Sequence, residues 1–446
     1  MLSTLTSCPN LSLFQASGAK QQYVLLESPD KKEQLLIQRL PEQTPIACVE
    51  GRIPEGFQFQ AYASKGGDVG VLQDANGLLY FLLPGATVKG KDFKISYLGE
   101  TIPQAQVKPI EERQSSHQNY TTQAMILGAG LGTRILPLTE EYLGIAKPAL
   151  PWVGDSTVIG SLVDLLSKQG IQRIYVNTFY QRESVQEALN QACAKHGVQW
   201  FEIPEERPTG TAGGVLHILN NPQEFPSFNL DEPLLVLQGD AVSNVDLADL
   251  INVHHQQNAM ASVGCQIVSD EDVSKFGIIA TDASATENPS GFIHRFLEKP
   301  RLAEAGNSRL ASTGFYVLSP ALFPHLKAWY QERLETEQAE ARRQNETPST
   351  LVKEFDFAKD VFDMCLKHSL PLYAYEVAGF WCDIGNPAQY VETIAMAYRG
   401  ELGQALPPSI DDYYASQGVF YWKGCKAQAD QAQLTLAGGV VVTPKS

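Results

Sequence analysis

The pattern of hydrophobic and polar positions changes near residue 121 and divides the chain into regions of different structure. Before that point, short apolar runs such as 23–26 and 78–83 are separated by glycine, aspartate and proline. Runs of this length between turn residues are typical of β-strands. A polar stretch at 111–118 follows and indicates a linker. We therefore expect residues 1–120 to form a small β-rich N-terminal domain with its linker.

After residue 121, short apolar runs alternate with amphipathic segments. The strand-like runs lie at 124–127, 174–177, 198–203 and 234–237, and the helical segments at 158–168, 183–195 and from 211. This alternation predicts a Rossmann-like α/β domain with a mixed, mostly parallel sheet. A helix at 387–398 is expected to close this domain, 121–400, and residues 401–446 to form a short C-terminal tail. The polar stretch 331–346 predicts a solvated helix with no chemistry.

Composition narrows the classes of partner. Hydrophobic residues make up 43% of the chain and charged residues 19%, which is ordinary for a globular protein. The formal net charge of -16 argues against a nucleic-acid binder, which needs a basic face. No apolar run approaches the roughly 18 residues that cross a bilayer, and the N-terminus lacks the pattern of a signal peptide. The 7 cysteines include no CxxC pair, so we expect reduced cysteines in a cytoplasmic protein.

A glycine-rich turn directly follows the first strand of the α/β domain. Residues 128–134 read GAGLGTR, and PLT follows at 137–139. Closely spaced glycines let backbone N–H groups approach a phosphate chain, and the planar guanidinium of Arg134 suits phosphate oxygens. The GxGxG spacing and the proline disfavour the dinucleotide-binding GxGxxG turn. A bare structural loop remains the alternative.

This turn resembles the GxGxRxxPLT signature of the sugar-phosphate nucleotidyltransferases, and KPALP at 147–151 resembles their KPxLP element. The resemblance continues in order over about residues 121 to 400. It implies transfer of a nucleotidyl group from a nucleoside triphosphate to a sugar 1-phosphate, with Mg2+, giving an NDP-sugar and pyrophosphate. It assigns Arg134 and Lys147 to the triphosphate as the catalytic residues. Fixed cations suit this chemistry, because charge grows on phosphate oxygens in the transition state.

The string TGTAGGV at 209–215 resembles the family's LGTAGA element beside the nucleoside, although a plain helix N-cap is the alternative. Glu205, just upstream, corresponds in position to residues that accept hydrogen bonds from the base, with a solvated carboxylate as the alternative. The nucleotide-binding residues expected from the resemblance are Gly128, Ala129, Gly130, Gly132, Thr133, Glu205, Gly210 and Thr211.

Two aspartates are candidate metal ligands. Asp240 follows the buried run 234–237, at the carboxyl edge where α/β sheets place ligands. Asp383 lies in GFWCDIG at 379–385, which resembles the family's G-[YF]-W-x-D-I-G. The resemblance implies that both carboxylates bind Mg2+, and a helix N-cap is the alternative for Asp383.

The sugar phosphate is assigned from two further strings. FLEKP at 296–300 resembles the family's EKP element, and ASTGFYVL at 311–318 resembles its N-A-G-I-Y-V-L strand. Serine and threonine replace the family's Asn-Ala there, which leaves the identity of the sugar open. The expected sugar-phosphate-binding residues are Gly277, Glu298, Lys299 and Thr313.

Two other function classes compete with this interpretation. A catalytically silent sugar-nucleotide-binding regulatory protein would be expected to have lost a charged residue of the site, and all of them are present. A cytidylyltransferase for a non-sugar phosphate is disfavoured by the EKP and WxDIG elements. The expected partners are a nucleoside triphosphate and a sugar 1-phosphate, with no nucleic acid and no membrane. The base (UTP, GTP or dTTP), the sugar (glucose, mannose or another) and a homo-oligomeric state stay open.

Overall fold

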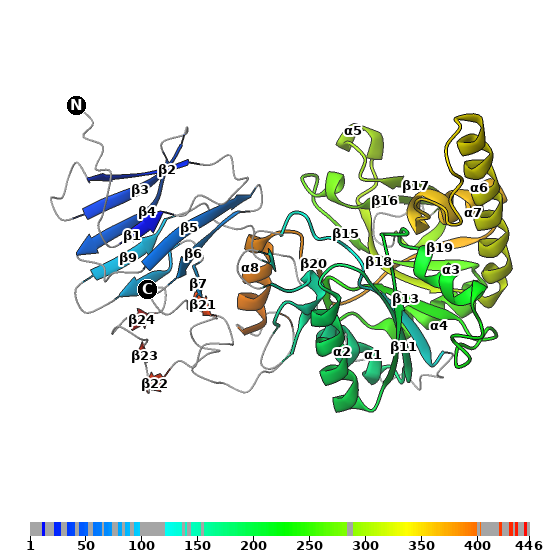
Figure 1. The fold of residues 1–446 in the computed structure, drawn as a ribbon, viewed down its shortest axis with the longest axis horizontal. Coiled ribbons are helices and arrows are strands. Elements are labelled where there is room, and N and C mark those ends of the chain that lie inside the picture. The colour runs from blue at the N-terminus through cyan, green and yellow to red at the C-terminus, as the bar shows by residue number, and fades with distance from the viewer. Residues whose placement is uncertain are drawn as a thin grey trace. The chain divides into compact units, whose positions relative to one another are not determined.

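The chain is represented by a computed structural model (Figure 1). It describes residues 121–398 apart from 136–138, 141–143, 153–155 and 283–288, and outside that range chiefly the strands given below. The chain forms two compact units. The smaller unit combines Met1–Val107, Thr133–Tyr142 and Ile384–Ser446, and the larger unit combines Lys108–Gly132 and Leu143–Asp383.

The larger unit is built on a nine-stranded sheet with the order β12-β11-β10-β13-β18-β15-β19-β17-β16. Its strands are β10 (Gln123–Leu127), β11 (Arg173–Thr178), β12 (Gln199–Pro204), β13 (Leu234–Gln238), β15 (Ala261–Ile267), β16 (Gly277–Thr281), β17 (Gly291–Glu298), β18 (Leu310–Leu318) and β19 (Leu372–Glu376). Strands β10 to β13 pair in parallel, as does β15 with β19.

The expected excess of parallel pairings is wrong. Strand β18 lies between β13 and β15 and runs antiparallel to both, and β17 runs antiparallel to β16 and β19. Strand–helix–strand alternation, which forces parallel pairing, describes only the chain up to β13. Strands β16 and β17, which follow each other in the chain, instead pair antiparallel. The sheet is therefore of mixed orientation.

Helices cover both faces of this sheet, as Figure 1 shows for α1 and α2 on one side and α6 and α7 on the other. The helical elements are α1 (Val158–Lys168), α2 (Arg182–His196), α3 (Gly213–Asn220), α4 (Leu247–Gln257), α5 (Leu302–Ala305), α6 (Phe323–Arg343) and α7 (Phe362–Lys367), with short turns η2 (Lys147–Ala149), η3 (Val273–Lys275), η4 (Pro320–Leu322) and η5 (Phe357–Val361). The predicted helices 158–168 and 183–195 are thus confirmed as α1 and α2.

The core explains why β10 is apolar from Ala124 to Leu127. Met125 and Leu127 belong to the cluster formed with α3 and α6, whereas Ala124 and Ile126 belong to the cluster formed with α1 and α2. Successive side chains of a strand point to opposite faces, so a strand covered on both faces carries apolar residues on both. Burial on both sides fixes the edge of the sheet from which the glycine-rich turn starts.

The smaller unit contains strands from both ends of the chain. The described strands of this unit form two sheets, β1-β5-β6-β7-β21 and β2-β3-β4-β9-β8-β24-β23-β22. The strands are β1 (Leu11–Leu13), β2 (Gln22–Glu27), β3 (Gln34–Leu40), β4 (Thr44–Gly51), β5 (Phe57–Ser64), β6 (Gly67–Gln73), β7 (Leu79–Leu82), β8 (Thr87–Lys89), β9 (Phe93–Tyr97), β21 (Val419–Tyr421), β22 (Gln428–Asp430), β23 (Gln433–Thr435) and β24 (Val441–Thr443).

Three features of this unit were not predicted from the sequence. Strand β21 pairs with β7 and β24 with β8, so the tail contributes strands to sheets that begin in the N-terminal region. Helix α8 (Pro387–Tyr398) packs against β5 and β6 rather than closing the larger unit. Residues 133–142 also group with this unit. Such long-range pairings leave no mark on local periodicity, and the three-part division of the chain stays a prediction.

Candidate functional site

A short strand pairing brings the two expected metal ligands together. Asp240 follows β13 and leads into β14 (Ala241–Ser243), which pairs antiparallel with β20 (Trp381–Asp383). The register places Ala241 opposite Asp383. Gly239 makes the sharp exit from β13 possible, because a Cβ there would lie 2.6 Å from the carbonyl oxygen of Leu127. Two residues more than a hundred positions apart therefore meet at one point.

Lys147 lies between these carboxylates. Its Nζ donates to Asp240 Oδ2 at 2.6 Å and to Asp383 Oδ1 at 3.1 Å, and its side chain is 7% exposed. Burial alone lowers the pKa of the ammonium, but the charges of the two carboxylates and their hydrogen bonds outweigh it, so the pKa lies above its ordinary value. Lys147 therefore stays charged at neutral pH, and the three side chains form one ion cluster.

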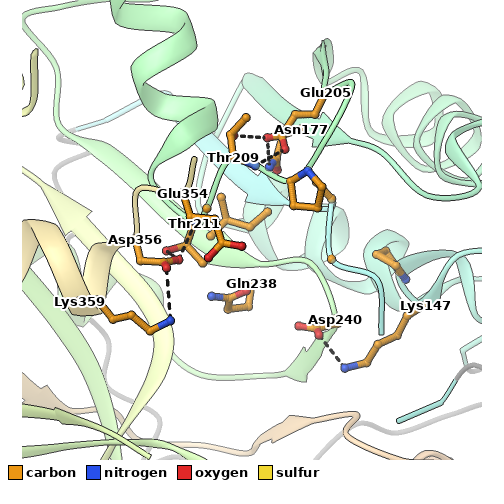
Figure 2. A pocket seen from close by; sticks show the side chains of 16 residues that line it. Lys147, Asn177, Glu205, Thr209, Thr211, Gln238, Asp240, Glu354, Asp356 and Lys359 are labelled. Atoms are coloured by element: carbon orange, nitrogen blue, oxygen red, sulfur yellow. Dashed lines mark hydrogen bonds and ion pairs between the residues drawn. The ribbon is translucent and has the colours of Figure 1, made fainter. Parts of the chain in front are cut away.

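The cluster borders a cavity of about 290 Å³ (Figure 2). Several residues expected to bind nucleotide or phosphate line it: Ala129, Gly130, Lys147, Glu205, Gly210, Thr211 and Asp240. Other lining residues were not predicted from the sequence: Leu127, Pro148, Asn177, Pro208, Thr209, Gln238, Glu354, Asp356 and Lys359. Asn177 and Gln238 lie at the carboxyl ends of β11 and β13, and the rule that located Asp240 would also have found them.

The glycine-rich turn is held by Asn177. The Gly128 N–H donates to Asn177 Oδ1 at 3.0 Å, and Asn177 Nδ2 donates to Glu205 Oε1 at 2.8 Å. Glu205 also accepts hydrogen bonds from the backbone N–H and the hydroxyl of Thr209, both at 3.0 Å. The carboxylate expected to read the base thus fixes the loop that follows it. Base recognition by Glu205 stays a prediction.

The loop 208–212 is hydrogen-bonded to residues 355–356, a segment that was not predicted from the sequence to belong to the site. The Phe355 N–H donates to Thr209 O and the Ala212 N–H to Phe355 O, both at 2.9 Å. Asp356 accepts from the N–H and the hydroxyl of Thr211 at 3.0 and 3.1 Å. Gly210 fits between them with φ +88, and a Cβ there would lie 2.5 Å from the Phe355 backbone.

The polar helix α6 holds this segment in place. Its Glu337 accepts the Lys353 N–H at 3.0 Å, and its Gln338 donates to Ser349 O at 2.8 Å. From the other side, the Arg207 guanidinium donates to the carbonyl oxygens of residues 351–353. The stretch predicted as a solvated helix is helical, and its side chains also brace a wall of the cavity. No periodicity in residues 349–359 signalled that contribution.

The expected sugar-phosphate residues lie on other strands of the larger unit. Gly277 pairs with Glu298 across β16 and β17, and a Cβ at Gly277 would meet the Phe296 ring at 2.7 Å. Lys299 adopts φ 47, and its Nζ lies 3.5 Å from Glu298 Oε1. The Thr313 hydroxyl is buried and donates to Gly264 O at 2.7 Å, and its contact with a sugar phosphate stays a prediction.

Arg134 and Thr133 belong to the smaller unit, whereas Gly132, with φ +58, belongs to the larger one. Within the smaller unit, Gly385 lies beside the Arg134 guanidinium, and a Cβ built there would come within 3.2 Å of it. The triphosphate contacts expected of Arg134, Gly132 and Thr133 stay predictions.

The chain is similar to one known protein family and to several individual proteins. The sequence pattern of the family described as "Nucleotidyl transferase" matches residues 123–399. A UTP--glucose-1-phosphate uridylyltransferase of Synechocystis sp. is 30% identical over 72% of this chain and 73% of its own length. A glucose-1-phosphate adenylyltransferase of Thermotoga maritima is 32% identical over 61% and 59%, and the mannose-1-phosphate guanylyltransferase catalytic subunit beta of Danio rerio 27% identical over 63% and 66%. These relatives differ in both base and sugar.

No described helix of the present chain is long and apolar enough to span a membrane.

Proposed function

Because the chain belongs to the nucleotidyl transferase family, we propose that it transfers a nucleotidyl group from a nucleoside triphosphate to a sugar 1-phosphate, giving an NDP-sugar and pyrophosphate. The observation that carries the proposal is the cluster of Lys147, Asp240 and Asp383 beside a cavity that the glycine-rich turn also lines. It combines a cation for phosphate oxygens, two hard oxygen ligands and backbone that a phosphate chain can approach.

The proposed reaction requires positioned phosphate groups and positive charge near them rather than a strong base. A phosphate oxygen of the sugar 1-phosphate forms a bond to the α-phosphorus, and the bond from that phosphorus to the bridging oxygen breaks as pyrophosphate leaves. A phosphomonoester with a second pKa near 6 is largely dianionic at neutral pH, so its oxygen needs no deprotonation. In this proposal Lys147 holds phosphate oxygens, which is supported by its lining the same cavity as Ala129 and Gly130. Arg134 and Lys147 are the catalytic residues in this proposal.

The residues present fit Mg2+. Asp240 Oδ2 and Asp383 Oδ1 accept from the same ammonium, so their oxygens converge on one cation position. Among the described residues no set of three or more His, Cys, Asp or Glu forms a metal cage. Mg2+ suits such a site, since it usually binds through one or two carboxylates plus substrate phosphates. When bound, it supplies positive charge to the reacting phosphate oxygens.

The proposal extends to the remaining ligands and to the layout of the chain. Gly128, Ala129, Gly130, Gly132, Thr133, Glu205, Gly210 and Thr211 bind the nucleotide, and Gly277, Glu298, Lys299 and Thr313 the sugar phosphate. A small β-rich domain precedes the catalytic domain, and the strands β1–β9 support this part. UTP or GTP with glucose or mannose 1-phosphate are the leading substrate pairs. A cytoplasmic location rests on the cysteine pattern alone.

A pyrophosphate-release assay tests the function. Five nucleoside triphosphates are each combined with glucose 1-phosphate and mannose 1-phosphate, in Mg2+ and in excess EDTA. At least one pair should release pyrophosphate only when sugar phosphate and Mg2+ are both present. A folded protein that binds sugar nucleotides but releases no pyrophosphate with any pair would favour the regulatory alternative.

A further inference from the structure

An ammonium group fills the position that a metal ion would need. Lys147 Nζ lies 2.6 Å from one carboxylate oxygen and 3.1 Å from the other. A Mg2+ ion bound by Asp240 and Asp383 requires the same oxygens at about 2.0–2.1 Å. Two cations cannot share that space, since each would repel the other at close range. Lys147 and a divalent cation therefore compete for one pair of ligands.

The Lys147 side chain can leave while its backbone stays. Lys147 begins the short turn η2, whose residues are buried, and the preceding Ala146 N–H donates to Ser184 Oγ at 2.9 Å. The four-carbon side chain is flexible and also lines the cavity. A swing of the ammonium away from the carboxylates therefore requires no rearrangement of the fold.

Three other described carboxylates line the cavity; Glu354 is exposed to solvent, and the other two already accept hydrogen bonds. Glu205 already accepts three hydrogen bonds from Asn177 and Thr209, and Asp356 accepts two from Thr211 with Lys359 Nζ 3.6 Å away. Moving the ammonium without a new anion would leave a nearly buried charge unpaired, which is strongly unfavourable. Phosphate oxygens entering the cavity supply the missing acceptor.

We propose that Lys147 is the resident counter-ion of Asp240 and Asp383, and that it yields this position to a divalent cation only when phosphate oxygens occupy the cavity. The proposal rests on the proposed function, because it needs a triphosphate at this place. Metal alone then binds weakly, and metal and triphosphate strengthen each other's binding through Lys147. The coupling is reciprocal, as any binding linkage must be.

Binding of Mn2+ alone, followed by electron paramagnetic resonance, tests this without nucleotide or turnover. Lys147→Met removes the charge and keeps the length of the side chain, so it should bind Mn2+ at least about tenfold more tightly than the wild type. Lys359→Met is the matched control, because it removes a positive charge from the same cavity without touching Asp240 or Asp383. Its Mn2+ affinity should stay within about threefold of the wild type.

Two further variants keep the test decisive. Adding Asp240→Asn to Lys147→Met should abolish the gain, since the ion then loses a ligand. Lys147→Gln serves if circular dichroism shows that Lys147→Met is unfolded. Wild-type affinity for Mn2+ equal to that of a folded Lys147 variant overturns the proposal. A chain that makes no NDP-sugar overturns the proposed function instead, and the Mn2+ titration does not depend on it.

Discussion

Gly210→Ala probes the wall of the cavity. Gly210 adopts φ +88, and a residue with a Cβ pays about 1–2 kcal/mol for left-handed backbone. The new Cβ would also lie 2.5 Å from Phe355 N and O and must retreat to at least 3.4 Å. That movement breaks the two hydrogen bonds that join Phe355 to Thr209 and Ala212, worth about 0.5–1.5 kcal/mol each. Together these effects should lower the free energy of unfolding by about 2–5 kcal/mol.

Gly197→Ala separates the backbone effect from the collision. Gly197 adopts φ +67 at the end of α2, but a Cβ there meets nothing within 4 Å, so only about 1–2 kcal/mol is expected. Thermal unfolding and calorimetric titration with the preferred nucleoside triphosphate measure both variants. Gly210→Ala should melt lower than Gly197→Ala and bind nucleotide at least about tenfold more weakly than the wild type. If the two variants melt alike and both bind nucleotide normally, the packing argument is refuted.

Three other perturbations have defined outcomes. Asp240→Asn keeps the shape but removes a charge from the cluster, so kcat should fall by about 10²–10³ in steady-state assays, and near-normal kcat would remove the metal ligand assignment. Burial and, less strongly, the charge of His255 lower the pKa of His254 to about 4 from 6.5. The neutral, buried His254 therefore contributes its full stability to the fold above pH 6.5, and this contribution is lost as the pH falls toward 4. His254→Gln should flatten the stability profile there by roughly 2–4 kcal/mol, and an unchanged slope in denaturant titrations would contradict this. Deleting residues 1–107 removes β5 and β6, against which α8 packs. The truncated chain should therefore melt lower, and equal melting by calorimetry would refute that packing role.

Local sequence patterns predicted the helices and strands that are determined by interactions between residues close together in the sequence. Helix 158–168 has an apolar face, and Thr157 caps it by accepting the Gly160 N–H at 3.0 Å. The carboxyl-edge rule likewise located Asp240, because β13 is buried on both faces and ends there. Periodicity also indicated β-structure before residue 121.

Other features depend on contacts between distant segments. Nothing near Lys147 in the sequence indicates that its ammonium lies between Asp240 and Asp383, since the pairing of β14 with β20 creates that arrangement. The reversed directions of β17 and β18 and the docking of α8 on β5 and β6 have the same origin. Glu354 and Asp356 were missed because they follow a polar helix and carry no periodic signal of their own.

The fate of the phosphate oxygens tests nucleotidyl transfer to a sugar 1-phosphate most directly. The hexose 1-phosphate that supports most pyrophosphate release is prepared with 18O in its non-bridging phosphate oxygens, and the products are resolved by mass spectrometry. Because a phosphate oxygen of the sugar attacks the α-phosphorus, the NDP-sugar should retain all of the label and pyrophosphate none. Label in pyrophosphate, or release of nucleoside monophosphate without any NDP-sugar, would contradict the account.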